Sequence, residues 1–349
     1  MGLNLRHEVL RLALRDPFVI ARAEHGGGHE VTTIVVELRD DRFPGVVGVG
    51  EGYPDSYYGE TPETMVAVWP LLLSAIGEPE LTLDGLAGAA DAMTAAIAHH
   101  GAAKCALDIA LHDLAAKVAG VPLHAFLGLP RELPPTDFTI GIDAPAVVAE
   151  RAARAAHFPA LKIKVGGSAD LATLEAVRAV FAGPIRVDAN TGWSPDDAIA
   201  LLPHLERLGV ELIEQPFRAR RLDQLRELQE RSSLPIVADE SAVTIEDLDG
   251  LVDVVAGVNV KLAKCGGVGP AKRMLERAHE LGFRTFLGCM EETSVGIAAS
   301  AAVASLADWV DLDGNLLLAA DPFTGLVLGA DCRWQLSANP GLGLERRRS

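Results

Sequence analysis

Basic clusters are nearly absent from this 349-residue sequence. The only run of three basic residues is Arg346 to Arg348, and the formal net charge is -17. A polyanion would find no basic stripe to bind, so we expect no nucleic acid partner. The chain also lacks any run of about 20 apolar residues, the length that a membrane-spanning helix needs. We therefore expect no membrane partner.

Cysteine is equally scarce. Cys105, Cys265, Cys289 and Cys332 are far apart in the sequence and form no CxxC pair. This spacing argues against both a zinc site and a small disulfide framework. The first residues carry a charge every few positions and lack the apolar centre of a secretory signal. We expect a protein of the reduced cytoplasm.

Short apolar runs recur about every 25 residues from residue 135 onward, and each precedes a stretch with helical periodicity. The eight runs cover residues 136–143, 160–166, 184–190, 210–216, 235–241, 257–264, 284–290 and 308–314. Alternating strands and helices indicate a parallel sheet with right-handed crossovers. Eight such units favour a closed (β/α) barrel over a doubly wound open sheet, the weaker alternative.

The first 125 residues follow a different, α+β pattern. Extended segments come first, and Ala-rich helical stretches follow them. The strand VTTIVVEL and the segment GVVGVGEG are separated by a turn-rich stretch, which predicts an antiparallel pair. We therefore expect a separate domain over residues 1–125 and a barrel domain over residues 126–320.

Three carboxylates stand where consecutive strands of the predicted barrel end. Asp188, Glu214 and Asp239 are one repeat apart, which brings them side by side at one barrel mouth. Three hard anionic oxygens, with no His or Cys among them, favour Mg²⁺ over zinc. The sequence therefore predicts a magnesium site, at which Mn²⁺ can substitute.

Lysines flank these carboxylates on both sides. Lys164 ends the second strand and Lys261 ends the sixth, so the two amines are expected to face each other across the metal. We expect burial and the nearby cations to lower the pKa of such a lysine until it can act as a base. Lys162 and the metal would stabilise an enediolate formed next to a carboxylate. Proton removal on one face and return on the other predicts racemisation or epimerisation.

Three further residues accompany this set. Lys264 competes with Lys261, but strand alternation points Lys261 inward and leaves Lys264 to enter the loop CGGVG. Glu240 and Asn190 are expected just outside the metal ligands, with Glu240 orienting a lysine.

The motifs KIKVG, VDAN, IEQP, ADES, NVKLAKCGG and VDLDG occur in order along the chain. In this the sequence resembles the enolase superfamily, in particular its muconate lactonizing enzyme subgroup, and most closely the dipeptide epimerases of the L-Ala-D/L-Glu epimerase type. The resemblance implies a (β/α)7β modified TIM barrel with an N-terminal α+β capping domain. It also implies a cytoplasmic isomerase with one Mg²⁺ per subunit, in a homo-oligomer. Residues 321–349 are then expected to pack back on the capping domain.

The resemblance also implies roles for single residues. The metal ligands would be Asp188, Glu214 and Asp239, the acid/base pair Lys164 and Lys261, and the group that steadies the substrate carboxylate Lys162. Asp311 and Asp313 match the DxD pair that holds the α-ammonium of a dipeptide. Arg22 is the nearest match to an arginine that meets the substrate side chain. Glu291 stands where the family often has an apolar residue, a departure that favours a cationic or polar side chain over that of Ala-Glu.

Other functions remain open at this point. An N-succinylamino acid racemase or o-succinylbenzoate synthase would use the same lysines and metal, but an acylated substrate brings no ammonium to Asp311 and Asp313. A catalytically silent metal-binding or peptide-binding barrel would need neither Lys164 nor Lys261. The stretch HGGGH at 25–29 resembles a lipase oxyanion loop, but no GxSxG follows it, so a mobile lid is the expectation.

Overall fold

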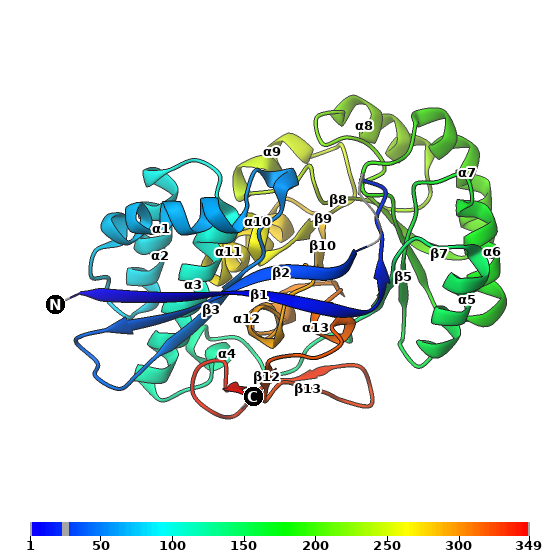
Figure 1. The fold of residues 1–349 in the computed structure, drawn as a ribbon. Helices are drawn as coiled ribbons and strands as arrows, with labels where there is room; N and C mark the ends of the chain where they lie inside the picture. Colours follow the sequence, from blue (N-terminus) through cyan, green and yellow to red (C-terminus); the bar gives the residue numbers. More distant parts are fainter. Residues whose placement is uncertain (1, 23–27, 348–349) are drawn as a thin grey trace.

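The computed structural model describes residues 2–22 and 28–347. It contains two packed parts, a capping part built on a three-stranded sheet and a barrel of eight parallel strands (Figure 1). The predicted glycine lid at 25–29 lies largely outside the described residues. None of the described helices has the length and apolar character that a membrane crossing requires.

The capping part contains an antiparallel sheet with the strand order β1-β2-β3. Its elements are β1 (Leu3–Phe18), β2 (Gly28–Asp40), β3 (Gly48–Gly52), α1 (Pro62–Ile76), α2 (Leu83–Ala96), α3 (Gly101–Ala119) and α4 (Leu123–Phe126). The register pairs Val36 with Gly50, which confirms the predicted pairing of the second and third segments. Thr61 precedes helix α1, and its side chain forms a capping box with Thr64.

Helix α3 packs directly on β3, and the glycines of β3 make this approach possible. A Cβ at Gly50 would collide with the backbone of Ala106, and one at Gly52 would collide with that of Ala102. The opposite side of α3 meets the barrel, where Asp108 accepts a hydrogen bond of 3.2 Å from the backbone of Gly269. Helix α3 therefore joins the two parts.

The eight barrel strands coincide with the eight predicted runs. They are β4 (Phe138–Ile140), β5 (Leu161–Lys164), β6 (Ile185–Asp188), β7 (Val210–Glu214), β8 (Ile236–Ala238), β9 (Gly257–Val260), β10 (Arg284–Leu287) and β11 (Trp309–Val310). They pair in chain order from β4 to β11. A parallel bridge between Thr136 and Val310 brings the first and last strands together. The predicted barrel with its α+β cap is confirmed.

Helices cover the outside of the barrel. They are α5 (Pro145–Arg154), α6 (Asp170–Val180), α7 (Pro195–Arg207), α8 (Leu222–Arg231), α9 (Leu248–Leu251), α10 (Leu262–Cys265), α11 (Val268–Glu280), α12 (Ser294–Ala301) and α13 (Gly314–Leu317). Inside the barrel, Leu212, Val237, Phe286 and Trp309 form a buried apolar cluster. Charged side chains lie beside this cluster, with Lys162 Nζ 5.2 Å from the centre of the Phe286 ring.

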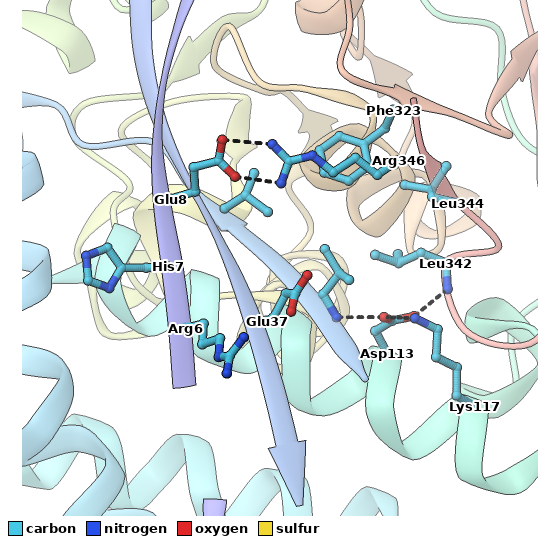
Figure 2. Close-up of a pocket in the computed structure, with 12 residues that line it drawn as sticks. Arg6, His7, Glu8, Glu37, Asp113, Lys117, Phe323, Leu342, Leu344 and Arg346 are labelled. Carbon is cyan, nitrogen blue, oxygen red and sulfur yellow. Dashed lines mark hydrogen bonds and ion pairs between the residues drawn. The ribbon is translucent and has the colours of Figure 1, made fainter. Parts of the chain in front are cut away.

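The C-terminal segment returns to the capping part (Figure 1). It contains the short strands β12 (Phe323–Thr324), β13 (Val327–Leu328), β14 (Trp334–Gln335) and β15 (Glu345–Arg346). Leu342 donates a backbone hydrogen bond of 2.8 Å to Asp113 of α3. A cavity of about 320 Å³ lies between this segment and strands β1 and β2 (Figure 2).

Candidate active site

Strand register places the predicted metal ligands next to one another. Lys164 of β5 is the direct partner of Asp188 on β6, and Asp188 is the partner of Glu214 on β7. Asp239 follows β8 by one residue. All three carboxylates are fully buried, and ligand oxygens from the three lie within 4.8 Å of one another.

Three buried carboxylates in one place need positive charge nearby, because unpaired burial would cost several kcal/mol for each ion. Their mutual effect is visible at Glu214, where burial and then the charge of Asp188 raise the pKa to about 7. The donor set offers only carboxylate oxygens, the ligands that a hard divalent cation prefers. These residues therefore fit a magnesium site.

The three predicted lysines all reach this group. Lys162 Nζ lies 2.8 Å from Glu214 Oε2 and 3.3 Å from Asp188 Oδ2. Lys164 donates a hydrogen bond of 2.6 Å to Asp188, and Lys261 donates one of 2.9 Å to Asp239. Since β6, β7 and β8 separate their strands, the amines of Lys164 and Lys261 flank the carboxylates from two sides.

The charges of the protein itself act on the pKa of Lys261 in both directions, and the predicted contribution of the metal stays a prediction. Burial and the charge of Lys162 do act to lower the pKa of Lys261, as expected. The Asp239 carboxylate outweighs them and raises that pKa above its ordinary value. Burial would by itself raise the pKa of Asp239, but Lys261 and Lys264 hold it well below its usual range.

Lys264 does not enter the loop, contrary to the prediction. Residues 262–265 form the helical turn α10, which turns the side chain back under the barrel mouth. There Lys264 is buried and donates to Asp239 Oδ1 at 2.5 Å and to three backbone carbonyl oxygens. It is a fixed positive charge for Asp239, and strand alternation could not reveal it, because the strand ends at Val260.

Asn259 is a functional residue that we did not assign from the sequence. It lies on β9, and its side-chain amide donates a hydrogen bond of 2.7 Å to Glu214 Oε1. It thereby orients the middle carboxylate of the three. The signal was present in the sequence, since alternation points both Asn259 and Lys261 into the barrel.

Asp311 and Asp313 lie at the same mouth, beyond β11. Lys162 donates a hydrogen bond of 2.8 Å to Asp311, and the Thr139 hydroxyl donates a second one of 3.0 Å. Asp313 accepts a hydrogen bond of 2.6 Å from the backbone N–H of Thr139. Burial, and then the charge of Asp311, raise the pKa of Asp313 well above its usual range. An arriving ammonium would reverse this effect, because it supplies the missing positive charge.

Arg22 and Glu240 pair with each other across the two parts of the molecule. Arg22 donates a hydrogen bond of 3.0 Å to Glu240, and its guanidinium lies 4.2 Å above the Tyr57 ring. The side-chain amide of Asn190 donates a hydrogen bond of 3.3 Å to the same oxygen of Glu240. The prediction that Glu240 orients a lysine is therefore corrected, since its hydrogen bonds go to Arg22 and Asn190. The sequence could not predict this pairing, because Arg22 belongs to the capping part and is far from Glu240 along the chain.

These side chains surround one cavity of about 470 Å³ between the barrel mouth and the capping part. Its charged lining residues are Arg22, Asp55, Lys162, Lys164, Lys261, Glu291, Asp311 and Asp313. Two segments of the capping part, around Phe18 to Arg22 and around Tyr53 to Tyr57, contribute to the wall. The predicted residues are thus brought together around a space that suits a small molecule.

A second pair of buried carboxylates lies outside this wall. Glu51 of β3 accepts hydrogen bonds from the Thr293 backbone and hydroxyl and from the Gly296 backbone, at 2.6–2.9 Å. Glu292 is buried beside it, and its Oε1 has no hydrogen-bond partner among the described residues. Burial and the charge of Glu51 raise the pKa of Glu292 to about 8. No sequence motif had pointed to this pair.

Family models match nearly the whole chain. Residues 6–128 match the N-terminal domain of mandelate racemase / muconate lactonizing enzyme, and residues 146–349 match the enolase C-terminal domain-like family. The chain belongs to the enolase superfamily.

Three known members of the superfamily show how similar this chain is to characterised proteins. L-Ala-D/L-Glu epimerase of Bacteroides thetaiotaomicron is 36% identical over 95% of this chain and 85% of its own. L-Lys-D/L-Arg epimerase of Methylococcus capsulatus is 37% identical, over 90% and 91%. The structure of the Enterococcus faecalis dipeptide epimerase, complexed with Mg and L-Leu-L-Tyr, has a TM-score of 0.90 and 32% identity, over 99% and 100%.

Proposed function

We propose that this protein is a magnesium-dependent dipeptide epimerase, an isomerase that inverts the α-carbon of the C-terminal residue of a dipeptide. The placement of Lys164 and Lys261 on two sides of three buried carboxylates carries this proposal. A binding protein would not need two amines in these positions. The similar proteins named above, three epimerases, agree with it.

The proposed metal ligands are Asp188, Glu214 and Asp239. When bound there, Mg²⁺ would attract the substrate carboxylate and offset the negative charge that builds up next to it as the α-proton leaves. Lys162 would add a positive charge beside the same carboxylate, since it already lies against Glu214 and Asp188.

Proton transfer is assigned to the two flanking lysines. One amine takes the α-proton from one face of the carbon, and the other returns a proton to the opposite face. The amine that acts as the base must be neutral. The charge of Asp239 raises the pKa of Lys261, so this effect has to be weakened before Lys261 can accept a proton. As a metal ligand, Asp239 would share its charge with the cation and so raise the pKa of Lys261 less, while Lys264 keeps this carboxylate in place.

Asp311 and Asp313 are proposed to bind the free α-ammonium of the dipeptide. Both are buried and close to Thr139, which fixes their orientation through its hydroxyl and its backbone. An N-succinylated substrate would bring an uncharged amide to this place. When such a substrate is bound, Asp311 and Asp313 would be shielded from water without receiving a positive charge from it. We therefore favour the dipeptide over the acylated amino acid.

Proton NMR in D₂O tests this function. With Mg²⁺ and L,L-dipeptides that include Ala-Glu, we expect loss of the α-proton signal of the second residue and appearance of the diastereomer, both stopped by EDTA. Lys164→Ala and Lys261→Ala should each lower epimerisation by about 10²- to 10⁴-fold, the usual contribution of a general acid or base. If the α-proton exchanges in N-succinylamino acids and not in dipeptides, the protein would instead be an N-succinylamino acid racemase.

We also propose a cytoplasmic setting, since all four cysteines are free thiols in the structure. That the protein is a homo-oligomer stays a prediction, which light scattering would test.

A further inference from the structure

We infer that the preferred dipeptides carry a cationic side chain, such as that of lysine or arginine, on their first residue, and that Glu291 binds it. This inference rests on the proposed function and adds the class of substrate to it.

Among the described residues, the charges of the cavity leave two carboxylates unmatched by a cation, Asp313 and Glu291, and Asp313 is already proposed to bind the α-ammonium. Each cation in the wall is already paired, namely Lys162 with Glu214 and Asp311, Lys164 with Asp188, Lys261 with Asp239, and Arg22 with Glu240 and Asp55. Glu291 also lines the cavity, but within residues 2–22 and 28–347 it forms no ion pair with any cation. It is therefore available to a positive charge on the substrate.

The position of Glu291 selects the first residue of the dipeptide. It lies in the loop after β10, between Met290 and Glu292. A Cβ on Gly314 would collide with the backbone of both these neighbours, so the loop packs directly against the turn that carries Asp313. Because Asp313 is proposed to bind the α-ammonium of the first residue, the side chain of that same residue starts next to Glu291. Arg22 belongs to a different wall, against Glu240 and Asn190.

Tyr53 lines the same cavity as Glu291. Burial, and then the charge and hydrogen bond of Glu291, raise the pKa of the Tyr53 hydroxyl well above its ordinary value. Tyr53 therefore stays protonated and remains a donor to Glu291. A carboxylate that is oriented before binding loses less freedom when it meets a cation.

A neutral first residue would be bound less well for a physical reason. A substrate that fills the cavity removes water from Glu291, and an ion buried without a partner is costly. The ammonium of a lysine side chain supplies that partner, whereas norleucine, which has the same alkyl chain without the ammonium, does not. The two differ in the ammonium alone, so their comparison isolates its contribution.

The test uses pairs of dipeptides that share the second residue and carry L-lysine or L-norleucine as the first. We measure kcat/KM for α-proton exchange by NMR, with Mg²⁺ and with alanine, glutamate or leucine as second residue. The wild type should prefer lysine by at least about tenfold. Glu291→Gln should bring this ratio close to one, while Tyr53→Phe, which removes only the donor, should lower it in part.

Glu276→Gln is the matched control. It removes one negative charge from α11, where Glu276 is exposed and paired with Lys272, and it should keep the wild-type ratio. Equal rates for lysine and norleucine in the wild type would overturn the inference, and so would an unchanged preference in Glu291→Gln. The proposed function survives both results, because dipeptides still exchange. If no dipeptide exchanges at all, the proposed function fails, and the inference falls with it.

Discussion

The cavity at the barrel mouth and the cavity beneath the C-terminal segment are both lined by charges of both signs, but only the first has the features of an active site. Behind the lysines that line the cavity at the barrel mouth, Asp188, Glu214 and Asp239 are fully buried and adjacent. In the cavity beneath the C-terminal segment, Glu8 and Arg346 are about half exposed and form a bidentate pair with each other (Figure 2). The number of charges is therefore a poor guide to function.

The difference lies in what each set of charges needs. Glu8 and Arg346 satisfy each other in water, where such a pair changes stability little. The carboxylates at the barrel mouth repel one another and are buried out of contact with water. Four lysines form the ion pairs that offset this repulsion. A folded protein maintains such an arrangement at a cost in stability, which makes it a strong candidate for function.

Among substitutions that remove no charge, the largest effect is expected from Gly288→Ala, which disturbs the barrel mouth. A Cβ at this position would lie 2.7 Å from Asn259 Oδ1 and 3.1 Å from Lys261 Cε. The added methyl group would displace the Lys261 side chain from its position beside the substrate. Such a displacement should lower the rate of epimerisation by about 10²-fold. The NMR exchange assay measures this rate.

Gly250→Ala is the control for that substitution. Nothing lies within 4 Å of a Cβ at Gly250, so it should retain full activity. A Gly288→Ala protein that folds with wild-type kcat would show that the position of Lys261 is less constrained than its contacts imply.

A smaller effect, on stability, is expected from Glu292→Gln. The pKa of Glu292 is raised from 4.5 to about 8 by burial and by Glu51. The folded state therefore binds this proton more tightly than the unfolded chain does. The resulting stabilisation is complete below about pH 4.5, declines as the pH rises, and is lost by about pH 8.

Urea unfolding at pH 5, 6.5 and 8 measures this effect. Relative to Glu292→Gln, whose amide does not titrate, the wild type should lose unfolding free energy over this range. Parallel pH profiles of the two proteins would mean that Glu292 is already ionised at pH 5, contrary to its position beside Glu51.

Strand-end charges made the barrel and its mouth predictable from sequence. Asp188, Glu214 and Asp239 recur with the period of the strand-helix repeat, so one periodic pattern fixes both the fold and the position of the carboxylates. Lys164 and Lys261 follow from the same rule. The eight strands that the sequence indicates are the eight of the structure.

Contacts between distant segments could not be predicted in this way. The pairing of Arg22 with Glu240 depends on how the capping part sits on the barrel, which no local pattern encodes. Lys264 was misplaced because a single helical turn, α10, reverses its direction after the strand has ended. The direction of the pKa shift of Lys261 depends on a balance between burial, Lys162 and Asp239 that only coordinates provide.

The smallest effect is expected in the second cavity. Arg346→Ala removes a partner of Glu8 from a pair that is 46% and 49% exposed, so the free energy of unfolding should change by no more than about 1 kcal/mol. The exchange rate should stay that of the wild type, because Arg346 lines a cavity separate from the one that holds the lysines. Urea unfolding and the NMR assay measure the two quantities. A tenfold loss of activity in Arg346→Ala would couple the C-terminal segment to the barrel mouth, and the two cavities could then no longer be treated as independent.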